Sequence, residues 1–191
     1  MTELAPWRVA LAGPPASFVL DDEAFVIAGE WSALLQHLTV VGWHLPLLYD
    51  LLDEPSADYL DDRLDDPDDP LTLRQLARVA EGLVEAATGR RWWVAQRLLA
   101  SVADEWQELD GALLLRGVDL TRLARAEPAR LCNVMYALCV EHLPRKDREM
   151  FEFKLQRPPH GLDVREAPVM TEEQQGAAFM SAMHALQGGK G

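Results

Sequence analysis

Hydrophobic and polar residues follow a helical period over most of this chain, most clearly in residues 89–115. There the apolar side chains recur every three or four residues, and the charged and amide side chains fall largely between them. The apolar positions are Trp92, Ala95, Leu99, Val102, Trp106, Leu109 and Leu113. The pattern predicts one amphipathic helix with a wide, tryptophan-bearing apolar face.

The first 27 residues lack this helical period. Residues 7–11 alternate with a period of two, and a turn-like Asp21-Asp22-Glu23 separates the apolar runs 18–20 and 25–27. These features predict a small sheet of two or three short strands. From Glu30 the period becomes helical and predicts two short helices, separated by Gly42.

Two sequence signals place the next long helices. Thr72 followed by Gln75 is a capping box, and Gly89 is a stop signal, so a helix is expected from residue 73 to about 87. Pro128 opens another helix whose residues 131–140 are apolar nearly all round, which is typical of a bundle centre. The residues expected to be buried on the strongest stripes are Trp106, Leu131, Val134 and Leu138.

A short amphipathic helix is expected over residues 146–156, ended by Pro158-Pro159, and a last capping box at Thr171 begins a terminal helix. The sequence thus predicts a mainly α fold, a helical bundle with a small N-terminal β element. Its expected parts are residues 1–53 (the β element and two short helices), 54–70 (an acidic linker), 71–157 (the helical core) and 158–191 (a loop and the C-terminal helix).

The negative charge is concentrated in one segment. The formal net charge is −13, and residues 53–69 hold nine acids and one arginine, a net of −8. With Pro55, Pro67 and Pro70 among these acids, the segment is expected to be an exposed linker, with at most a turn of helix around residues 59–64. Such acidity argues against direct binding of a nucleic-acid backbone, which needs clustered lysine and arginine.

The cysteines and the N-terminus indicate a cytoplasmic protein. Cys132 and Cys139 lie two helical turns apart, too far to form a disulfide, and are expected to be reduced core thiols. The first residues lack a signal-peptide pattern, and no apolar run approaches the roughly 18 residues of a membrane span, so secretion and membrane spanning are disfavoured.

No set of side chains has the spacing of a catalytic, cofactor or metal site. The paired aspartates after Tyr59 lack the alternation of a calcium loop, so a solvated charge run is favoured. His37 and His44 are seven residues apart without further ligands, so partly buried core histidines are favoured over a metal site. Neither a nucleophilic serine motif nor a phosphate-binding glycine loop occurs.

Two features suit the binding of a partner. Arg90-Arg91 beside Trp92-Trp93 could bind an anion or stack on a base, although a basic pair after a helix more often complements the helix dipole. The terminal helix has a methionine-rich face that fits either an apolar partner or the protein's own core. The candidate partner-binding residues are Trp92, Trp93, Phe179, Met180, Met183 and Leu186.

Three segments resemble a known family. GEWSALLQHLTVVGWHLPLLYDLLDE (29–54), TGRRWWVAQRLLASVADEWQELDGALLLRGVD (88–119) and the Ala/Met-rich terminal helix are similar to the tail assembly chaperones of long-tailed (siphovirus-type) actinobacterial phages. An arginine- and alanine-rich, lysine-poor composition suggests a GC-rich coding genome, as such a source would have.

The resemblance implies a non-catalytic protein of the host cytoplasm, without cofactor or metal, that binds the tape-measure protein during tail assembly. It also implies contacts with other copies and a longer −1 frameshift product, whose slippery codons would fall at Gly189-Lys190. Two other hypotheses remain open. One is an acidic inhibitor that mimics nucleic acid, and the other is a small hydrolase that would use the unassigned histidines and aspartates.

Overall fold

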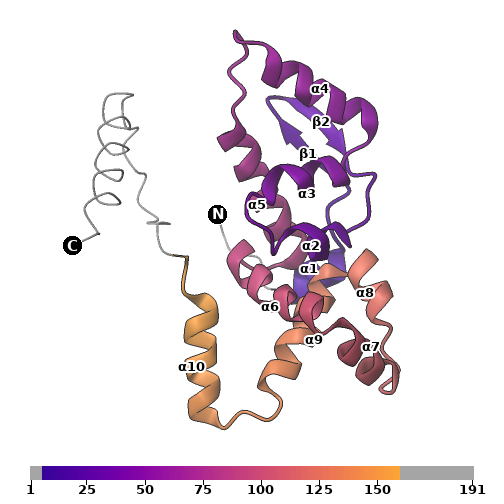
Figure 1. The fold of residues 1–191 in the computed structure, drawn as a ribbon, viewed down its shortest axis with the longest axis vertical. Helices are drawn as coiled ribbons and strands as arrows, with labels where there is room; N and C mark the ends of the chain where they lie inside the picture. Colours follow the sequence, from indigo (N-terminus) through magenta and orange to yellow (C-terminus); the bar gives the residue numbers. More distant parts are fainter. Residues whose placement is uncertain (1–5, 160–191) are drawn as a thin grey trace, which may run out of the picture. The chain divides into compact units, whose positions relative to one another are not determined.

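The structure is a computed structural model that describes residues 6–159, which form an α-helical bundle with one β-hairpin near the N-terminus (Figure 1). The predicted fold class, mainly α with a small N-terminal β element, is confirmed. The chain divides into two compact units, residues 1–157 and residues 158–191. The predicted C-terminal helix lies outside the described residues.

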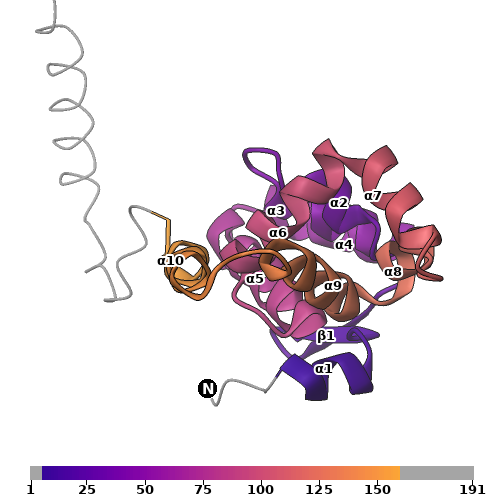
Figure 2. The ribbon, with the colours of Figure 1, turned by 90° about the horizontal axis from the view of Figure 1, so that it is seen from below.

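The described elements are α1 (Pro6–Ala12), β1 (Ser17–Leu20), β2 (Glu23–Val26), α2 (Ala33–His37), α3 (His44–Leu51), α4 (Glu54–Asp65), α5 (Leu73–Thr88), α6 (Trp92–Asp104), α7 (Trp106–Leu114), α8 (Leu120–Ala126), α9 (Pro128–Val140) and α10 (Arg145–Gln156). Three of them, α5, α6 and α9, pack on one another at the centre of the bundle (Figure 2).

The predicted hairpin is present. β1 pairs antiparallel with β2, and the two-residue turn is made by Asp21 and Asp22, whose φ angles of 50° and 68° are the positive values that a tight hairpin turn requires. On one face the rings of Phe18 and Phe25 stack with centroids 5.1 Å apart, and Tyr59 of α4 lies 6.1 Å from Phe25. The hairpin therefore packs against α4 through aromatic side chains.

The expectation of a strand at residues 7–11 is wrong, because this segment forms α1. A period of two over five residues also fits a helical turn with one buried position. Val9 is that position, with 6% of its surface exposed, whereas Leu11 is 74% exposed. α1 lies against α5 and α9, so tertiary packing decides its conformation.

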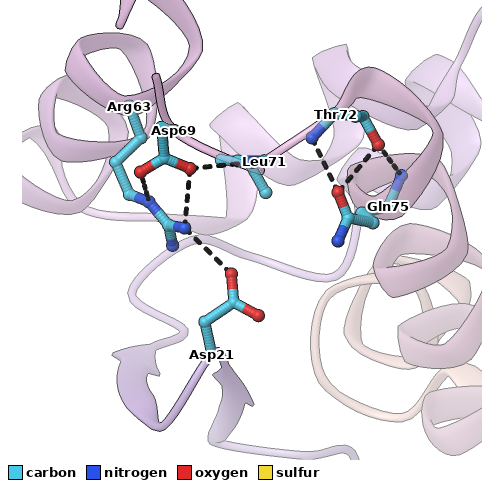
Figure 3. Close-up of polar contacts among 6 residues, drawn as sticks. All are labelled: Asp21, Arg63, Asp69, Leu71, Thr72 and Gln75. Carbon is cyan, nitrogen blue, oxygen red and sulfur yellow. Dashed lines mark hydrogen bonds and ion pairs between the residues drawn. The ribbon is translucent and has the colours of Figure 1, made fainter. Parts of the chain in front are cut away.

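The two short helices α2 and α3 are confirmed, with Gly42 between them at a φ of 77°. The α5 boundaries are confirmed as well. Thr72 and Gln75 form both hydrogen bonds of the capping box (Figure 3), and Gly89 ends the helix in the left-handed conformation with a φ of 67°.

Residues 89–115 form two helices instead of the single one predicted. α6 ends at Asp104 and α7 begins at Trp106, because Glu105 leaves the helical conformation (φ −115°, ψ 27°). α6 follows the predicted stripe and buries Ala95, Leu99 and Val102. The rest of the predicted stripe, Trp106, Leu109 and Leu113, lies in α7 after the break, and α7 packs against α8.

The prediction of buried positions is confirmed for Leu131 and wrong for Trp106, Val134 and Leu138, which are only half-buried. The first turns of α9 carry the buried residues of that helix, and α9 packs against α1, α5, α6 and α8. Its last turn leads into residues 141–144, which are all exposed. Burial therefore declines toward the C-terminal end of α9.

The predicted acidic linker is also wrong over most of its length, because residues 54–65 form α4. Asp53 caps the helix by accepting the Ser56 N–H, Pro55 fits the first turn, and Leu60 is fully buried. These features anchor a helix whose acidic side chains would repel one another.

Arg63 ties α4 to the hairpin and to the segment that follows (Figure 3). Its guanidinium donates to both carboxylate oxygens of Asp69, at 2.8 and 2.9 Å, and to Asp21 at 2.9 Å. The hydrogen bonds from Arg63 and from the Leu71 N–H lower the pKa of Asp69, and those to Asp69 and Asp21 raise the pKa of Arg63. Arg63 thus compensates the negative charges of Asp21 and Asp69 next to the segment that leads into α5.

Candidate functional site

Trp92 and Trp93, the two predicted partner-binding residues that the structure describes, lie in the first turn of α6. Both are half-buried, and their rings meet edge to face with centroids 5.8 Å apart. Trp92 also lies 5.8 Å from Trp43, whose ring stacks on His44 at 4.0 Å. Trp92 is therefore part of an aromatic cluster that joins α6 to the start of α3.

The basic pair beside these tryptophans points in two directions. Arg91 forms an ion pair with Glu85 at 3.3 Å and lies 5.9 Å above the Trp93 ring. Arg90 donates to the Asn133 side chain at 2.9 Å. Each arginine is thus engaged within the fold, and the two do not converge on one anion site.

Trp93 contacts α10, the last described helix. Its indole Nε1 donates to the carbonyl oxygen of Gln156 at 3.2 Å. One turn further along α6, a single guanidinium nitrogen of Arg97 donates to the carbonyl oxygens of Lys154, Leu155 and Arg157 at 2.7 to 2.8 Å. The final carbonyl groups of a helix lack partners within the helix, so two side chains of α6 satisfy that end of α10.

Tyr136 of α9 also contacts α10. Its hydroxyl donates to Glu152, its ring lies 6.3 Å from Phe151, and Arg148 donates to the same hydroxyl at 3.3 Å. Arg148 also donates to Glu152 itself, at 3.1 Å. The two hydrogen bonds that Glu152 accepts, first from Tyr136 and then from Arg148, lower the pKa of its carboxyl group. Arg90 lies on the Tyr136 ring as well, 5.3 Å from its centroid.

We call the surface formed by Trp93, Arg97 and Tyr136 the α10 docking surface. The Leu155 carbonyl oxygen accepts from Arg97 on this surface, and the Leu155 side chain is part of the hydrophobic core, with only 3% of its surface exposed. Elsewhere α10 is open to solvent, and its Met150 and Phe153 are 53% and 67% exposed. No sequence pattern marked Arg97 or Tyr136 as part of a site, because each donates hydrogen bonds to residues of α10 that are distant in the sequence.

Further apolar side chains are exposed on other elements. Leu114 and Leu115, at the end of α7, are 56% and 92% exposed. On the hairpin, Val19 and Val26 are both more than half exposed. The described part of the chain therefore presents several separate apolar positions to solvent.

The two histidines pair with separate carboxylates. His37 lies 2.5 Å from Asp50, and His44 lies 3.5 Å from Glu81. Both histidines are half-buried, in agreement with the favoured interpretation. Among residues 6–159, no group of three or more metal-ligating side chains comes together.

Cys132 is buried, Cys139 is half-buried, and both are free thiols. None of the helices in the described range is both long and apolar enough to cross a membrane. The remaining predicted partner-binding residues, Phe179, Met180, Met183 and Leu186, lie outside the described residues, as does the Gly189-Lys190 pair.

Comparisons with protein-family models, with curated proteins and with solved structures find no match for this chain.

Proposed function

We propose that this protein is a non-catalytic assembly chaperone of a long-tailed phage, which binds the tape-measure protein in the host cytoplasm. The similarity of residues 29–54 and 88–119 to that family motivates the proposal. In this proposal, the short form and a longer −1 frameshift form act together on the same partner.

The docking of α10 is the observation that carries the proposal. The bundle holds an amphipathic helix at its edge by burying one leucine, Leu155, and by donating to the helix carbonyl groups from Trp93 and Arg97. A tape-measure protein is a long helix with apolar stripes, and it offers apolar side chains along its length and unpaired carbonyl groups at its C-terminal end. A fold that packs its own helix in this way has the chemistry to bind a partner's helix.

The exposed acidic face of α4 supports the same function. Its side chains are exposed at Asp58, Asp62 and Asp65, among others, so this part of the surface carries strong negative charge. Net charge of one sign keeps proteins soluble and discourages self-association. A chaperone for an aggregation-prone partner needs that property in the complex.

Co-expression tests the proposal. Under this proposal, the tape-measure protein of the same phage should be soluble when co-expressed with this chain and should aggregate without it. A chain that folds, as judged by circular dichroism, and leaves the tape-measure protein insoluble contradicts the proposal.

The methionine-rich terminal face gives a second readout. Replacing Met180 and Met183 with serine should weaken partner binding more than it lowers the melting temperature. A large fall in melting temperature with binding retained would assign these residues to the protein's own core.

A mimic of nucleic acid is the second candidate, and the ordered state of α4 favours it. A helix holds its carboxylates at fixed spacings, whereas a linker would not. A triple variant with Asp58→Asn, Asp62→Asn and Asp65→Asn removes three exposed charges of this helix. It keeps Asp61, which accepts a hydrogen bond from Tyr49, and Asp69, which accepts from Arg63. If the protein is a chaperone, this variant should still keep its partner soluble. If the variant instead loses the ability to inhibit a nucleic-acid-binding target, the result would support the mimic.

A further inference from the structure

α10 is attached to the bundle at one end. Residues 141–150, which include the connection from α9 and the first half of α10, are all exposed. Burial begins only at Phe151 and is complete only at Leu155. A segment with so few buried contacts opens at a lower free energy than the bundle as a whole.

The hydrogen bonds from α6 to the attached end of α10 go to its main chain and not to its side chains. Arg97 and Trp93 donate to main-chain carbonyl groups, which every helix presents at its C-terminal end. The donors therefore select a helix end and its polarity, and they do not depend on the side chains of residues 154–157. A helix of another protein can satisfy them equally well.

Two side chains of α10 add specificity. Leu155 is buried in the hydrophobic core beside the α10 docking surface, and Glu152, three residues earlier, accepts the hydrogen bond from Tyr136. Both side chains lie on one face of the helix, because residues three apart are neighbours on a helix surface. The surface thus fits a carboxylate followed three residues later by a leucine.

We infer that the α10 docking surface is a binding site for the C-terminal end of an amphipathic partner helix, and that α10 occupies it as an internal competitor. The preferred helix carries a glutamate or aspartate three residues before a leucine, within its last two turns. The identity of the partner rests on the proposed function, whereas the site and its competitor do not.

The connection between α9 and α10 determines how strong the competition is. It consists of residues 141–144, so a detached α10 stays near its surface. Short linkers give effective concentrations of about 1 mM, so a partner helix binds well only when α10 is weakened or when its own affinity is higher.

A synthetic, fluorescently labelled peptide with the sequence of residues 145–157 tests the inference on the full-length chain. The Leu155→Asp chain should bind this peptide in an anisotropy titration, and the wild-type chain should bind it at least about tenfold more weakly, because its own α10 competes. A peptide that itself carries Leu155→Asp should fail to bind.

A second substitution shows where the peptide binds. Arg97→Met in the Leu155→Asp chain should weaken peptide binding about tenfold or more, because the charged donor to three of the helix carbonyl groups is lost. Arg78→Met, at an exposed position on α5, is the matched control and should leave the affinity unchanged. If Leu155→Asp disturbs the circular dichroism spectrum, Glu152→Arg, at a half-exposed position, replaces it.

Three results would overturn the inference. They are equal peptide affinity of the wild-type and α10-weakened chains, insensitivity of binding to Arg97→Met, and no binding to a folded α10-weakened chain at about 1 mM peptide. Tape-measure solubility is a separate readout. Peptide binding without tape-measure solubilisation would support the site and contradict the proposed function.

Discussion

Gly29 lies against the backbone of Asp50, so closely that a Cβ atom at position 29 would stand 1.9 Å from the Asp50 carbonyl oxygen. The Gly29 N–H donates to the carbonyl oxygen of Leu51 at 3.1 Å. The segment before α2 therefore packs directly on the last turn of α3, and no side chain fits between them.

Gly29→Ala should destabilise the protein by at least about 2 kcal/mol, because two backbone segments must separate to admit the methyl group. Gly82→Ala is the matched control. Gly82 lies inside α5, and a Cβ atom added there would meet no atom within 4 Å, so alanine should stabilise by about 0.5 to 1 kcal/mol. Urea unfolding of both variants measures this, and an unchanged midpoint for Gly29→Ala would contradict the close approach.

Leu131 and Leu138 occupy α9 two turns apart and differ in burial. Leu131 is 1% exposed and Leu138 is half-buried. Leu131→Ala should cost about 2 to 5 kcal/mol, and Leu138→Ala clearly less, because less apolar surface is lost from the core. Denaturant unfolding of the two variants gives the comparison. Equal losses would mean that the end of α9 is packed as tightly as its start.

Burial raises the pKa of the Cys132 thiol from its ordinary value of 9.0 to about 12, and it raises the pKa of Cys139 as well. Since the thiolate is the reactive form, native Cys132 should resist a disulfide reagent at about pH 8. In a Cys139→Ser chain, the remaining thiol should react only as fast as the protein unfolds. The Cys132→Ser chain is the control, and its half-buried Cys139 should react faster.

The pair formed by Arg63 and Asp69 should make stability depend on pH in the acid range. The lowered pKa of Asp69 means that its contribution is complete above the ordinary value of 3.8 and is lost as the pH falls through the lowered value. Arg63→Met should therefore destabilise the protein near neutral pH, and the difference from wild type should shrink on acidification. Urea unfolding from about pH 6 to about pH 3 tests this, and a constant difference would contradict it.

The correct sequence predictions rest on signals that lie close together along the chain. Thr72 and Gln75 are three residues apart, and Asp21 and Asp22 are adjacent, so each pair specifies its own cap or turn.

The wrong prediction for residues 54–65 has two sources. The cap at Asp53 and Pro55 in the first turn are local helix signals, but the run of acids and prolines outweighed them. The contact between Arg63 and Asp21, 42 residues apart, appears in no local pattern.

The same reasoning explains what was missed at the candidate site. Trp93 could be selected from the sequence, because it lies beside the basic pair Arg90-Arg91 and aromatic residues are enriched at binding surfaces. The role of Arg97 depends on carbonyl groups 57 to 60 residues away, and any helix can supply such groups. A sequence pattern therefore gives no sign of this contact until the packing of α10 is known.

The acidic face of α4 has a consequence for ionic strength. Carboxylates three or four residues apart on a helix repel one another by a few tenths of a kcal/mol per pair, and dissolved salt screens such exposed charges over about 10 Å at 0.1 M. The ion pair of Arg63 and Asp69 is less accessible, with side chains 11% and 18% exposed, and is screened less. Added sodium chloride should therefore raise the melting temperature of this protein, so that a concentrated salt solution favours its folded state.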